Sequence, residues 1–305
     1  MEKLLKVLVL VSFLLIGFRG QSQLSAGRLQ RLEGFRSGYV DPRNVDVWLP
    51  ADYSPAKKYA VVYMHDGQML FDSTTTWNRQ EWGVDETMNE LLTQRKIRNC
   101  IVVAIWNNGK FRHPEYFPQK ALQYLSEDDR TELMNLSAGN EKLLQDGPLA
   151  DNYLQFLVKE LKPYVDQHFS TLSDRANTFI AGSSMGGLIS MYAICEYPGV
   201  FGGAACLSTH WPGTFQPENN PVPDALLTYL KKHLPSPQTH RIYFDYGDQT
   251  LDSWYELFQL RADEIMRQAG YNESNWLTRK FPGEDHSERA WKKRLSIPLM
   301  FLLRQ

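Results

Sequence analysis

A short turn between an apolar run and a helix-forming run constrains this chain more than any other stretch. The residues from Asn177 to Tyr192 predict a buried strand over 178–181, a tight turn and then a helix. The turn reads Gly-Ser-Ser-Met-Gly from Gly182 to Gly186, with Ser184 at its centre. Glycine at both ends tolerates crowding and backbone angles that a Cβ forbids. A serine on such a turn holds its hydroxyl above a sheet and beside a helix N-terminus, which suits a nucleophile.

Strand and helix patterns alternate along most of the chain. Nearly continuous apolar runs, typical of strands buried on both faces, occur at 59–64 and 100–106, and further strands are expected at 203–208 and 241–247. Helices are expected at 81–95, 152–169, 188–197 and 253–269, with a final helix from Trp291 onwards. This alternation predicts an α/β fold with a largely parallel sheet and helices on both faces. We expect one domain over residues 23–305, with an irregular polar insertion near 107–147.

The N-terminus has the pattern of a cleavable signal peptide. Lysines in residues 1–6 precede an apolar run from Val7 to Phe18, and the small residues Gly20 and Ser22 follow. We expect cleavage after Ser22, with Gln23 as the first mature residue, and therefore a periplasmic or secreted protein. An uncleaved anchor is the alternative, although the apolar run is shorter than the roughly 20 residues that span a bilayer.

The composition limits the classes of partner and cofactor that the protein is expected to bind. The formal net charge is -2 and no basic run occurs, so a nucleic-acid partner is not expected. Three cysteines, Cys100, Cys195 and Cys206, do not make a disulfide scaffold in a chain of 305 residues. No C-x-x-C or H-E-x-x-H spacing occurs, so we expect neither a metal nor another cofactor.

Polar residues follow several of the predicted strands, where open α/β sheets bind their ligands. A serine nucleophile needs a base that takes its proton and a carboxylate that orients the base. Ser184, then Asp248 or Asp252, then His286 occur in the order nucleophile, acid, histidine. His286 is the expected base because it follows the last strand in a glycine-containing loop. Asp252 is the preferred acid because a loop residue can turn back toward His286, and Asp248 is the alternative.

Two backbone amides are needed to stabilise an oxyanion in such a site. One is expected from Met185, the residue after the nucleophile, and the other from Gln68, in the loop after an early strand. The alternative for that loop is a metal site of His65, Asp66 and Asp72, but the usual ligand spacing is lacking, which favours a hydrogen-bonded turn.

Two further segments are candidates for substrate contacts. His210 and Trp211 follow the strand beside the nucleophile strand, where they line a pocket or, for Trp211, pack in the core. The insertion is expected to be a lid or a substrate-facing excursion. Four side chains in or beside it are candidates for shaping the cleft: Trp106, Arg112, Tyr116 and Phe117.

Four motifs make the chain resemble the esterase D-like group of the α/β-hydrolase superfamily, which includes feruloyl, acetylxylan and enterochelin esterases. They lie at 63–72, 182–187, 243–252 and 282–288, and the resemblance extends from about residue 28 to 303. It implies an α/β-hydrolase fold, with Ser184 as nucleophile, His286 as base and Gln68 as an oxyanion donor. Similar members carry Gly-Thr-Glu-Thr-Leu-Asp where this chain has Gly-Asp-Gln-Thr-Leu-Asp, so Asp252 is retained and Asp248 is a departure.

These patterns predict an exported serine esterase that hydrolyses a carboxylic ester through an acyl-enzyme. The expected substrate is a feruloyl, acetyl or other acyl ester on a carbohydrate. Three alternatives stay open: a siderophore-lactone esterase of the enterochelin type, an acyltransferase that uses the same triad, and a catalytically silent binding protein of the same fold.

Overall fold

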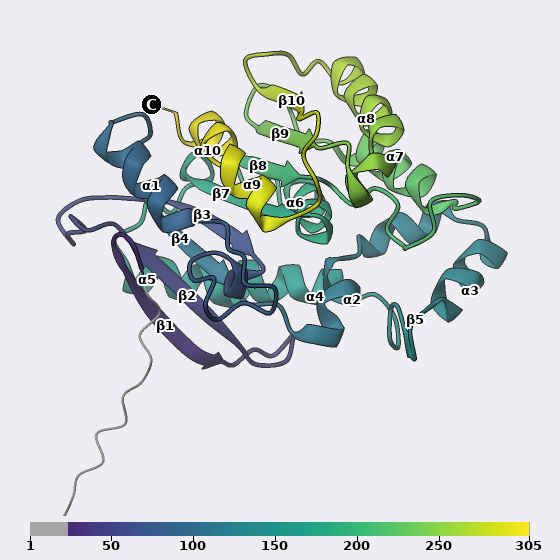
Figure 1. Cartoon of the computed structure of the whole chain (residues 1–305), viewed down its shortest axis with the longest axis horizontal. Helices are drawn as coiled ribbons and strands as arrows, with labels where there is room; N and C mark the ends of the chain where they lie inside the picture. The colour runs from purple at the N-terminus through teal and green to yellow at the C-terminus, as the bar shows by residue number, and fades with distance from the viewer. Residues whose placement is uncertain (1–23, 305) are drawn as a thin grey trace, which may run out of the picture.

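The central sheet has eight strands in the order β1-β2-β4-β3-β7-β8-β9-β10 (Figure 1). The computed structural model describes residues 24–304, so the expected signal peptide lies outside the described residues. β2 pairs antiparallel with β1 and β4, and the other neighbouring pairs are parallel, which confirms a largely parallel sheet. The strands are β1 (Arg28–Phe35), β2 (Arg43–Leu49), β3 (Ala60–His65), β4 (Cys100–Ile105), β7 (Thr178–Ser183), β8 (Gly203–Leu207), β9 (Arg241–Tyr246) and β10 (Trp276–Lys280).

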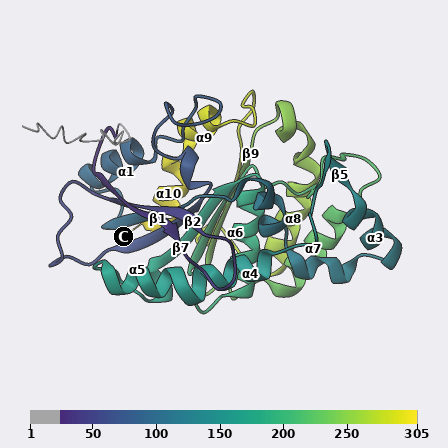
Figure 2. The ribbon, with the colours of Figure 1, turned by 90° about the horizontal axis from the view of Figure 1, so that it is seen from below.

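Both faces of the sheet are covered, which explains the continuous apolar runs. In β3, Val61 and Tyr63 belong to one hydrophobic cluster, whereas Val62 and Met64 belong to the other. Figure 2 shows α4 and α5 on one side of the sheet and α1, α9 and α10 on the opposite side. The bounds of these helices are α1 (Val84–Thr93), α4 (Ala150–Gln155), α5 (Lys162–His168), α9 (Glu288–Arg294) and α10 (Ser296–Leu303).

Two of the expected helices differ from the structure in detail. The helix expected over 152–169 consists of α4, a π-helical segment Phe156–Leu161 and α5. Pro163, which lacks the N–H of an α-helical hydrogen bond, follows the π-helical segment within two residues. The single helix expected at the C-terminal end is divided into α9 and α10. The remaining long helices are α6 (Met185–Glu196), α7 (Val222–His233) and α8 (Glu256–Gln268).

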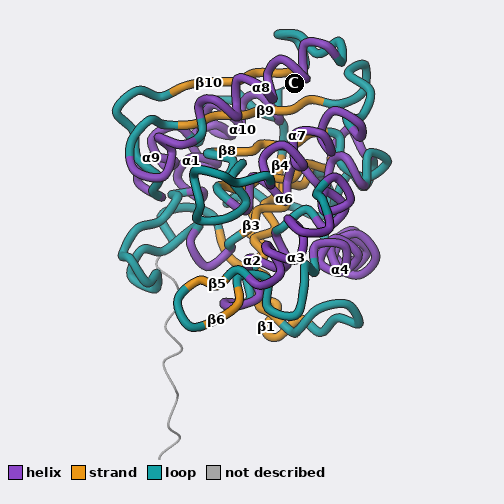
Figure 3. Tube along the Cα trace, turned by 90° about the vertical axis from the view of Figure 1, so that its right-hand side faces the viewer, coloured by secondary structure: helices purple, strands orange, loops and turns teal. Residues whose placement is uncertain are grey.

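The insertion at 107–147 is more regular than its polar sequence predicts. It contains α2 (Arg112–Tyr116), α3 (Glu127–Asn135) and a hairpin of β5 (Ser137–Ala138) and β6 (Glu141–Lys142). The hairpin and α3 lie at the right-hand end of Figure 1, which faces the viewer in Figure 3. A buried ion pair with N–O distances of 2.6 and 2.7 Å joins Arg43 in β2 to Glu115 in α2. This pair fixes the first helix of the insertion against the sheet.

The parallel strands place several loops at one edge of the sheet. The segments that follow β3, β7, β8, β9 and β10 all leave from the carboxyl ends of these strands. Among residues 24–304, no helix is long and apolar enough to cross a membrane.

Candidate active site

Ser184 lies on a strained turn between β7 and α6. It directly precedes α6 and has φ 58° and ψ −124°, a backbone conformation that residues other than glycine rarely adopt. A Cβ on Gly182 would lie 2.7 Å from the carbonyl carbon of Gly186, so the turn closes only with glycine at this position. The expected sequence of strand, tight turn and helix is confirmed. The turn brings Ser184 to the floor of a cleft.

The loop after β3 packs tightly against the nucleophile turn. A Cβ on Gly186 would lie 3.3 Å from both Asp66 Oδ2 and His65 Cβ. On the other side of the loop, a Cβ on Gly67 would lie 2.7 Å from the carbonyl carbon of Ala104 in β4. The small glycines therefore allow the two loops to approach each other closely.

Each of these two loops begins a helical segment with free N–H groups. Met185 is the first residue of α6, and Gln68 is the second residue of the short 3-10 helix Gly67–Met69. N–H groups at such positions have no partner within their own helix. Gln68 lines the cleft together with Ser184, while its side-chain Oε1 accepts a hydrogen bond from the Asn107 N–H at 3.2 Å. The geometry thus keeps two backbone donors near the serine.

His286 and Asp252 form a direct hydrogen bond, with 2.5 Å between Nδ1 and Oδ1. Asp252 is fully buried, whereas the His286 side chain is 14% exposed and lines the cleft with Ser184. The rings of Tyr255 and Trp291 pack nearly perpendicular to the imidazole, with centroids 5.8 and 5.0 Å away. These contacts fix the ring plane. The described structure contains no hydrogen bond between Ser184 Oγ and His286, although catalytic bonds of this kind often form only with substrate.

Asp252 accepts hydrogen bonds on both carboxylate oxygens. Besides the bond to His286, its Oδ2 accepts from the Ser208 hydroxyl and from the Gly247 N–H, both at 2.6 Å. A protonated carboxyl group would have to donate one of these bonds. Because a peptide N–H can only donate and Ser208 Oγ already accepts two N–H bonds, Oδ2 carries no proton. At Oδ1 the shared proton belongs to His286 Nδ1, since an imidazole is a stronger base than a carboxylate, so an ionised carboxylate fits the site best.

Asp248, the alternative acid, has a different role in the structure. Its Oδ1 accepts hydrogen bonds of 2.8 Å from the Gln249 side chain and from the Gly283 N–H. These two bonds hold the pKa of Asp248 below its ordinary value. Asp248 therefore holds the start of the loop that carries His286, and the structure pairs the imidazole with Asp252 instead.

The cleft above Ser184 has a volume of about 650 Å³. Most of its other walls come from residues 69–82, which follow Gln68 in the loop between β3 and α1, and from the start of α9. Neither segment was expected from the sequence to line the site. Trp77 in this loop is 85% exposed, and Asn78 donates a hydrogen bond of 2.8 Å to Glu288 across the cleft. The lining side chains from these segments are Met69, Trp77, Asn78, Gln80, Trp82, Ser287, Glu288 and Trp291. In the sequence, the only indication that this loop belongs to the site was a tryptophan, Trp77, in a polar stretch.

Asn107 and Arg112 are the insertion residues that line the cleft, where Arg112 pairs with Asp66. Its Nε and Nη2 atoms lie 2.7 and 2.8 Å from the two carboxylate oxygens, and Asn107 donates a further bond of 2.8 Å. Burial by itself would raise the pKa of Asp66, but the Arg112 charge and these hydrogen bonds outweigh it and lower the pKa. Asp66 thus stays charged beside the nucleophile turn.

The other three candidates near the insertion do not line the cleft. Trp106 donates a hydrogen bond of 2.8 Å to Asp46 in β2. Tyr116 and Phe117 are buried in the hydrophobic core. These side chains hold the insertion in place, and only its first residues face the cleft.

His210 and Trp211 also lie outside the cleft, which corrects the expectation that they line a substrate pocket. Their exposed fractions are 1% and 0%, because the loop after β8 folds inward. His210 Nδ1 lies 2.7 Å from the Tyr255 hydroxyl and Nε2 lies 3.0 Å from the Thr214 carbonyl oxygen. Burial lowers the pKa of His210 to about 3, so the ring is neutral. Trp211 donates a hydrogen bond of 2.9 Å to Gln259. It packs in the core, which was the alternative expected for this residue.

The residues considered as a metal site are bonded to protein groups. His65 Nδ1 lies 2.8 Å from the Tyr153 hydroxyl, Asp66 pairs with Arg112, and Asp72 accepts from Thr74 at 2.6 Å. Within residues 24–304, no group of three or more His, Cys, Asp or Glu side chains is arranged to hold a metal ion. Cys100, Cys195 and Cys206 are free and buried.

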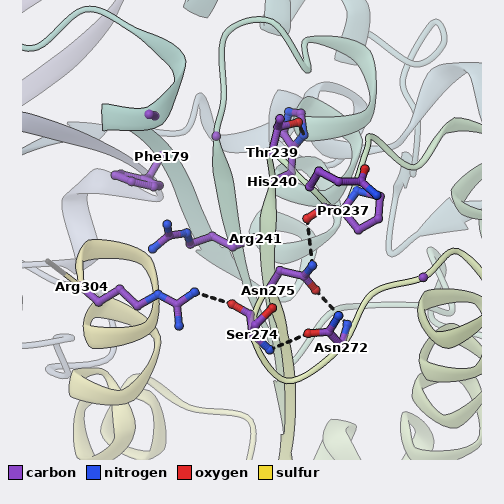
Figure 4. A pocket seen from close by; sticks show the side chains of 13 residues that line it. Phe179, Pro237, Thr239, His240, Arg241, Asn272, Ser274, Asn275 and Arg304 are labelled. Carbon is purple, nitrogen blue, oxygen red and sulfur yellow. Dashed lines mark hydrogen bonds between the residues drawn. The ribbon is translucent and has the colours of Figure 1, made fainter.

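A second cavity of about 490 Å³ lies at the opposite end of the parallel strands (Figure 4). Its two arginines bind backbone carbonyl groups. Arg241 donates to the Phe301 and Leu302 oxygens at the end of α10, and Arg304 donates to the Ser274 oxygen. Cations at the last carbonyl groups of a helix are a common stabilising arrangement. The two arginines of this cavity are therefore engaged in holding the end of α10 and the segment before β10.

Comparison with protein families gives one match that spans most of the chain. The model of the family described as "Putative esterase" matches residues 39–301. Among curated proteins, the uncharacterized protein YjcH of Bacillus subtilis is 23% identical over 177 residues, which are 58% of this chain and 59% of YjcH. The chain thus matches little more than half the length of that relative.

Solved structures with the same fold include two groups of esterases. The feruloyl esterase module from Clostridium thermocellum, solved as a mutant complexed with sinapinate, has a TM-score of 0.62 and 17% identity, and the match covers 90% of this chain and 88% of that one. The enterobactin esterase FES from Shigella flexneri has a TM-score of 0.60 and 16% identity, with coverage of 92% and 61%. These similarities confirm the expected α/β-hydrolase fold.

Proposed function

Because this chain belongs to the "Putative esterase" family, we propose that it hydrolyses a carboxylic ester with Ser184 as the nucleophile. One observation carries the proposal. A serine on a strained turn shares a cleft with a histidine whose far nitrogen is bonded to a buried carboxylate. These are the three parts that nucleophilic acyl transfer by serine needs.

The proton positions follow from the hydrogen-bond partners. An ionised Asp252 requires a donor at His286 Nδ1, so the Nδ1 atom carries the proton and the Nε2 atom is free to accept one. In the reaction, His286 Nε2 takes the hydroxyl proton while Ser184 Oγ attacks the ester carbonyl carbon. The imidazolium then returns this proton to the departing alkoxide oxygen as the ester C–O bond breaks, which leaves an acyl-enzyme. Water hydrolyses the acyl-enzyme by the same route and releases the carboxylic acid.

The oxyanion of each tetrahedral intermediate is assigned to the N–H groups of Met185 and Gln68. Both groups start helical segments, where the backbone N–H groups point outward without an internal partner. Such preorganised donors typically contribute about 10²–10³ in rate each. The tight packing between the two loops supports this assignment, because it leaves little freedom for the donors to move apart.

For the substrate, we propose an acyl ester on a carbohydrate, with a feruloyl or acetyl group as the acyl part. The cleft combines one exposed indole, from Trp77, with amide and charged side chains such as Asn78 and Gln80. An aromatic face beside hydrogen-bonding groups suits a sugar or a phenolic ring. The likeness to a feruloyl esterase module agrees with this class, and the likeness to an enterobactin esterase makes a siderophore lactone the second candidate.

The test compares wild type with Ser184→Ala on p-nitrophenyl acetate, methyl ferulate, acetylated xylan and enterobactin. We expect Ser184→Ala to lose at least about 10³-fold in kcat/KM. The neighbouring Ser183→Ala variant is the matched control and should stay within tenfold of wild type. Wild-type activity that survives Ser184→Ala would refute the nucleophile. Failure of wild type on all four esters would favour the silent binding protein, and preferential transfer to an added alcohol would favour the acyltransferase.

Export is a separate part of the proposal and rests on the sequence pattern of residues 1–22. When the full chain is expressed in a bacterium with a functional secretion pathway, the protein should be found in the periplasm or in the medium. Its N-terminal sequence should begin at Gln23. A product that keeps the first residues and stays with the membrane would support the uncleaved anchor instead.

A further inference from the structure

A buried polar network contacts Asp252 on the carboxylate oxygen that does not bond to His286. Its centre is the hydroxyl of Ser208, a residue just after β8 that is fully buried. Ser208 Oγ lies 2.6 Å from Asp252 Oδ2, 3.0 Å from Trp291 Nε1 and 2.9 Å from Arg294 Nη2. Indole and guanidinium nitrogens can only donate, so they occupy both acceptor positions of the hydroxyl. The single hydroxyl proton must therefore point at Asp252.

Arg294 is itself held by a second buried carboxylate. Its Nη2 and Nε atoms lie 2.9 and 3.2 Å from the two oxygens of Asp245 in β9. Tyr243 and the Ser208 N–H also donate to Asp245, at 2.9 and 3.1 Å. The Arg294 guanidinium stacks over Phe281 at 4.8 Å and approaches Asp252 Oδ2 at 4.0 Å. The cation is thus shared between two carboxylates, and it is fixed on both sides.

We propose that Ser208 and Arg294 are positioning residues that set the basicity of His286 through Asp252. The proposal rests on the proposed function, because it concerns the same histidine. The hydroxyl bond and the nearby cation stabilise the negative charge of Asp252, which therefore attracts the imidazolium less strongly. Without them the carboxylate holds the protonated ring more tightly, and His286 remains protonated to a higher pH. The network thus keeps the base free to accept the Ser184 proton.

Other titratable and charged groups face this pair and stay in place when Ser208 is changed. The neutral His210 and the buried Tyr255 lie on the side of the loop after β8, and the Asp66–Arg112 pair lies across the cleft. On the loop of His286 itself, the charged groups are paired at the surface: Glu284 with Lys293 and Asp285 with Arg289. A shift caused by Ser208→Ala can therefore be assigned to the lost hydroxyl.

The experiment measures the pH profile of kcat/KM for wild type and Ser208→Ala. The variant removes one oxygen atom and leaves the ion pair of Arg294 and Asp245 intact, so folding should be retained. We expect the midpoint of the acid limb to move to higher pH by about 0.5 unit or more, a threefold or greater change in proton affinity. Ser190→Ala is the matched control, because Ser190 is equally buried and bonds only to a carbonyl oxygen in α6, at 2.7 Å. Its acid limb should not move.

A second readout does not depend on ester hydrolysis. The Nδ1–H proton of His286, held by the short bond to Asp252, should give a low-field proton NMR resonance in both proteins, and its titration midpoint should shift in the same direction. Coinciding midpoints for Ser208→Ala and wild type, in either readout, would overturn the proposal and leave the network a purely structural role. Failure of the proposed function would show separately, because wild type would hydrolyse none of the four esters or its activity would survive Ser184→Ala. The NMR titration would still decide the role of Ser208 in either case.

Discussion

The replacement Asp252→Asn is expected to abolish most activity while the site keeps its shape. The amide oxygen would take the place of Oδ2, because the Ser208 hydroxyl and the Gly247 N–H both donate there at 2.6 Å. The reverse orientation would turn the amide NH₂ toward these two donors, and Ser208 cannot reorient because both its acceptor positions are occupied. The amide NH₂ group therefore faces His286.

An N–H group facing Nδ1 forces His286 into the wrong tautomer. The ring proton moves to the Nε2 atom, which can then no longer accept the proton of Ser184. The loss expected from such a tautomer change is about 10⁴-fold in kcat, or roughly 5.5 kcal/mol of transition-state stabilisation. The assay is steady-state hydrolysis of p-nitrophenyl acetate, with near-UV circular dichroism to establish that the variant is folded.

Asp248→Asn is the control for this experiment, because it distinguishes the two acids that the sequence offered. An asparagine oxygen can still accept from the Gly283 N–H, so the loop of His286 should keep its position. We expect a change in kcat of less than about threefold, since no proton transfer involves this residue. A folded Asp252→Asn variant within tenfold of wild type, or a larger loss in Asp248→Asn, would refute the assignment of the acid.

Three further predictions follow from the cleft and its supports. Trp77→Ala should raise KM for methyl ferulate about threefold to tenfold and leave KM for p-nitrophenyl acetate unchanged, because only the larger ester reaches the indole. Gly182→Ala should destabilise the fold by roughly 1–3 kcal/mol or more in urea unfolding, since its Cβ would lie 2.7 Å from backbone, whereas Gly199→Ala, with no atom within 4 Å, should be nearly neutral. Asp66→Asn should lower stability by about 1–2 kcal/mol at pH 7, because the partly exposed Arg112 loses its charged partner. Folding lowers the pKa of Asp66, so its charge stabilises the fold at pH values above the unfolded pKa of about 3.9. This stabilisation is lost as the pH falls through the lower pKa of the folded protein. The difference in stability between the variant and wild type should therefore shrink near pH 3.

The sequence was most informative where local geometry and chain order decide the structure. The glycines of the turn, the strand before it and the helix after it are short-range features, so the conformation of Ser184 could be predicted from a few residues. Asp252 and His286 could be nominated because each follows a strand of a parallel sheet, whose ends meet at one edge. Their pairing in the structure reflects this topology.

The cleft walls and the buried network depend on contacts between distant segments. Trp77 and Gln80 lie in an irregular loop with no hydrophobic period. A tryptophan in a polar stretch was the only local signal, and it does not show that the loop folds over the serine. Ser208 and Arg294 are 86 residues apart, and only the packing of α9 against the end of β8 brings them together. His210 was misplaced for a related reason, because a polar residue after a strand can turn inward when buried partners satisfy it.

Reaction with a serine-directed probe tests directly whether Ser184 is a nucleophile activated by the pair of His286 and Asp252. A fluorophosphonate probe reacts with activated serines, and peptide mass mapping identifies the modified residue. We expect one adduct, on the peptide that contains Ser184, with labelling absent in Ser184→Ala and strongly slowed in Asp252→Asn. An unlabelled wild type, an adduct on Ser183, or equal labelling of Ser184→Ala would contradict it.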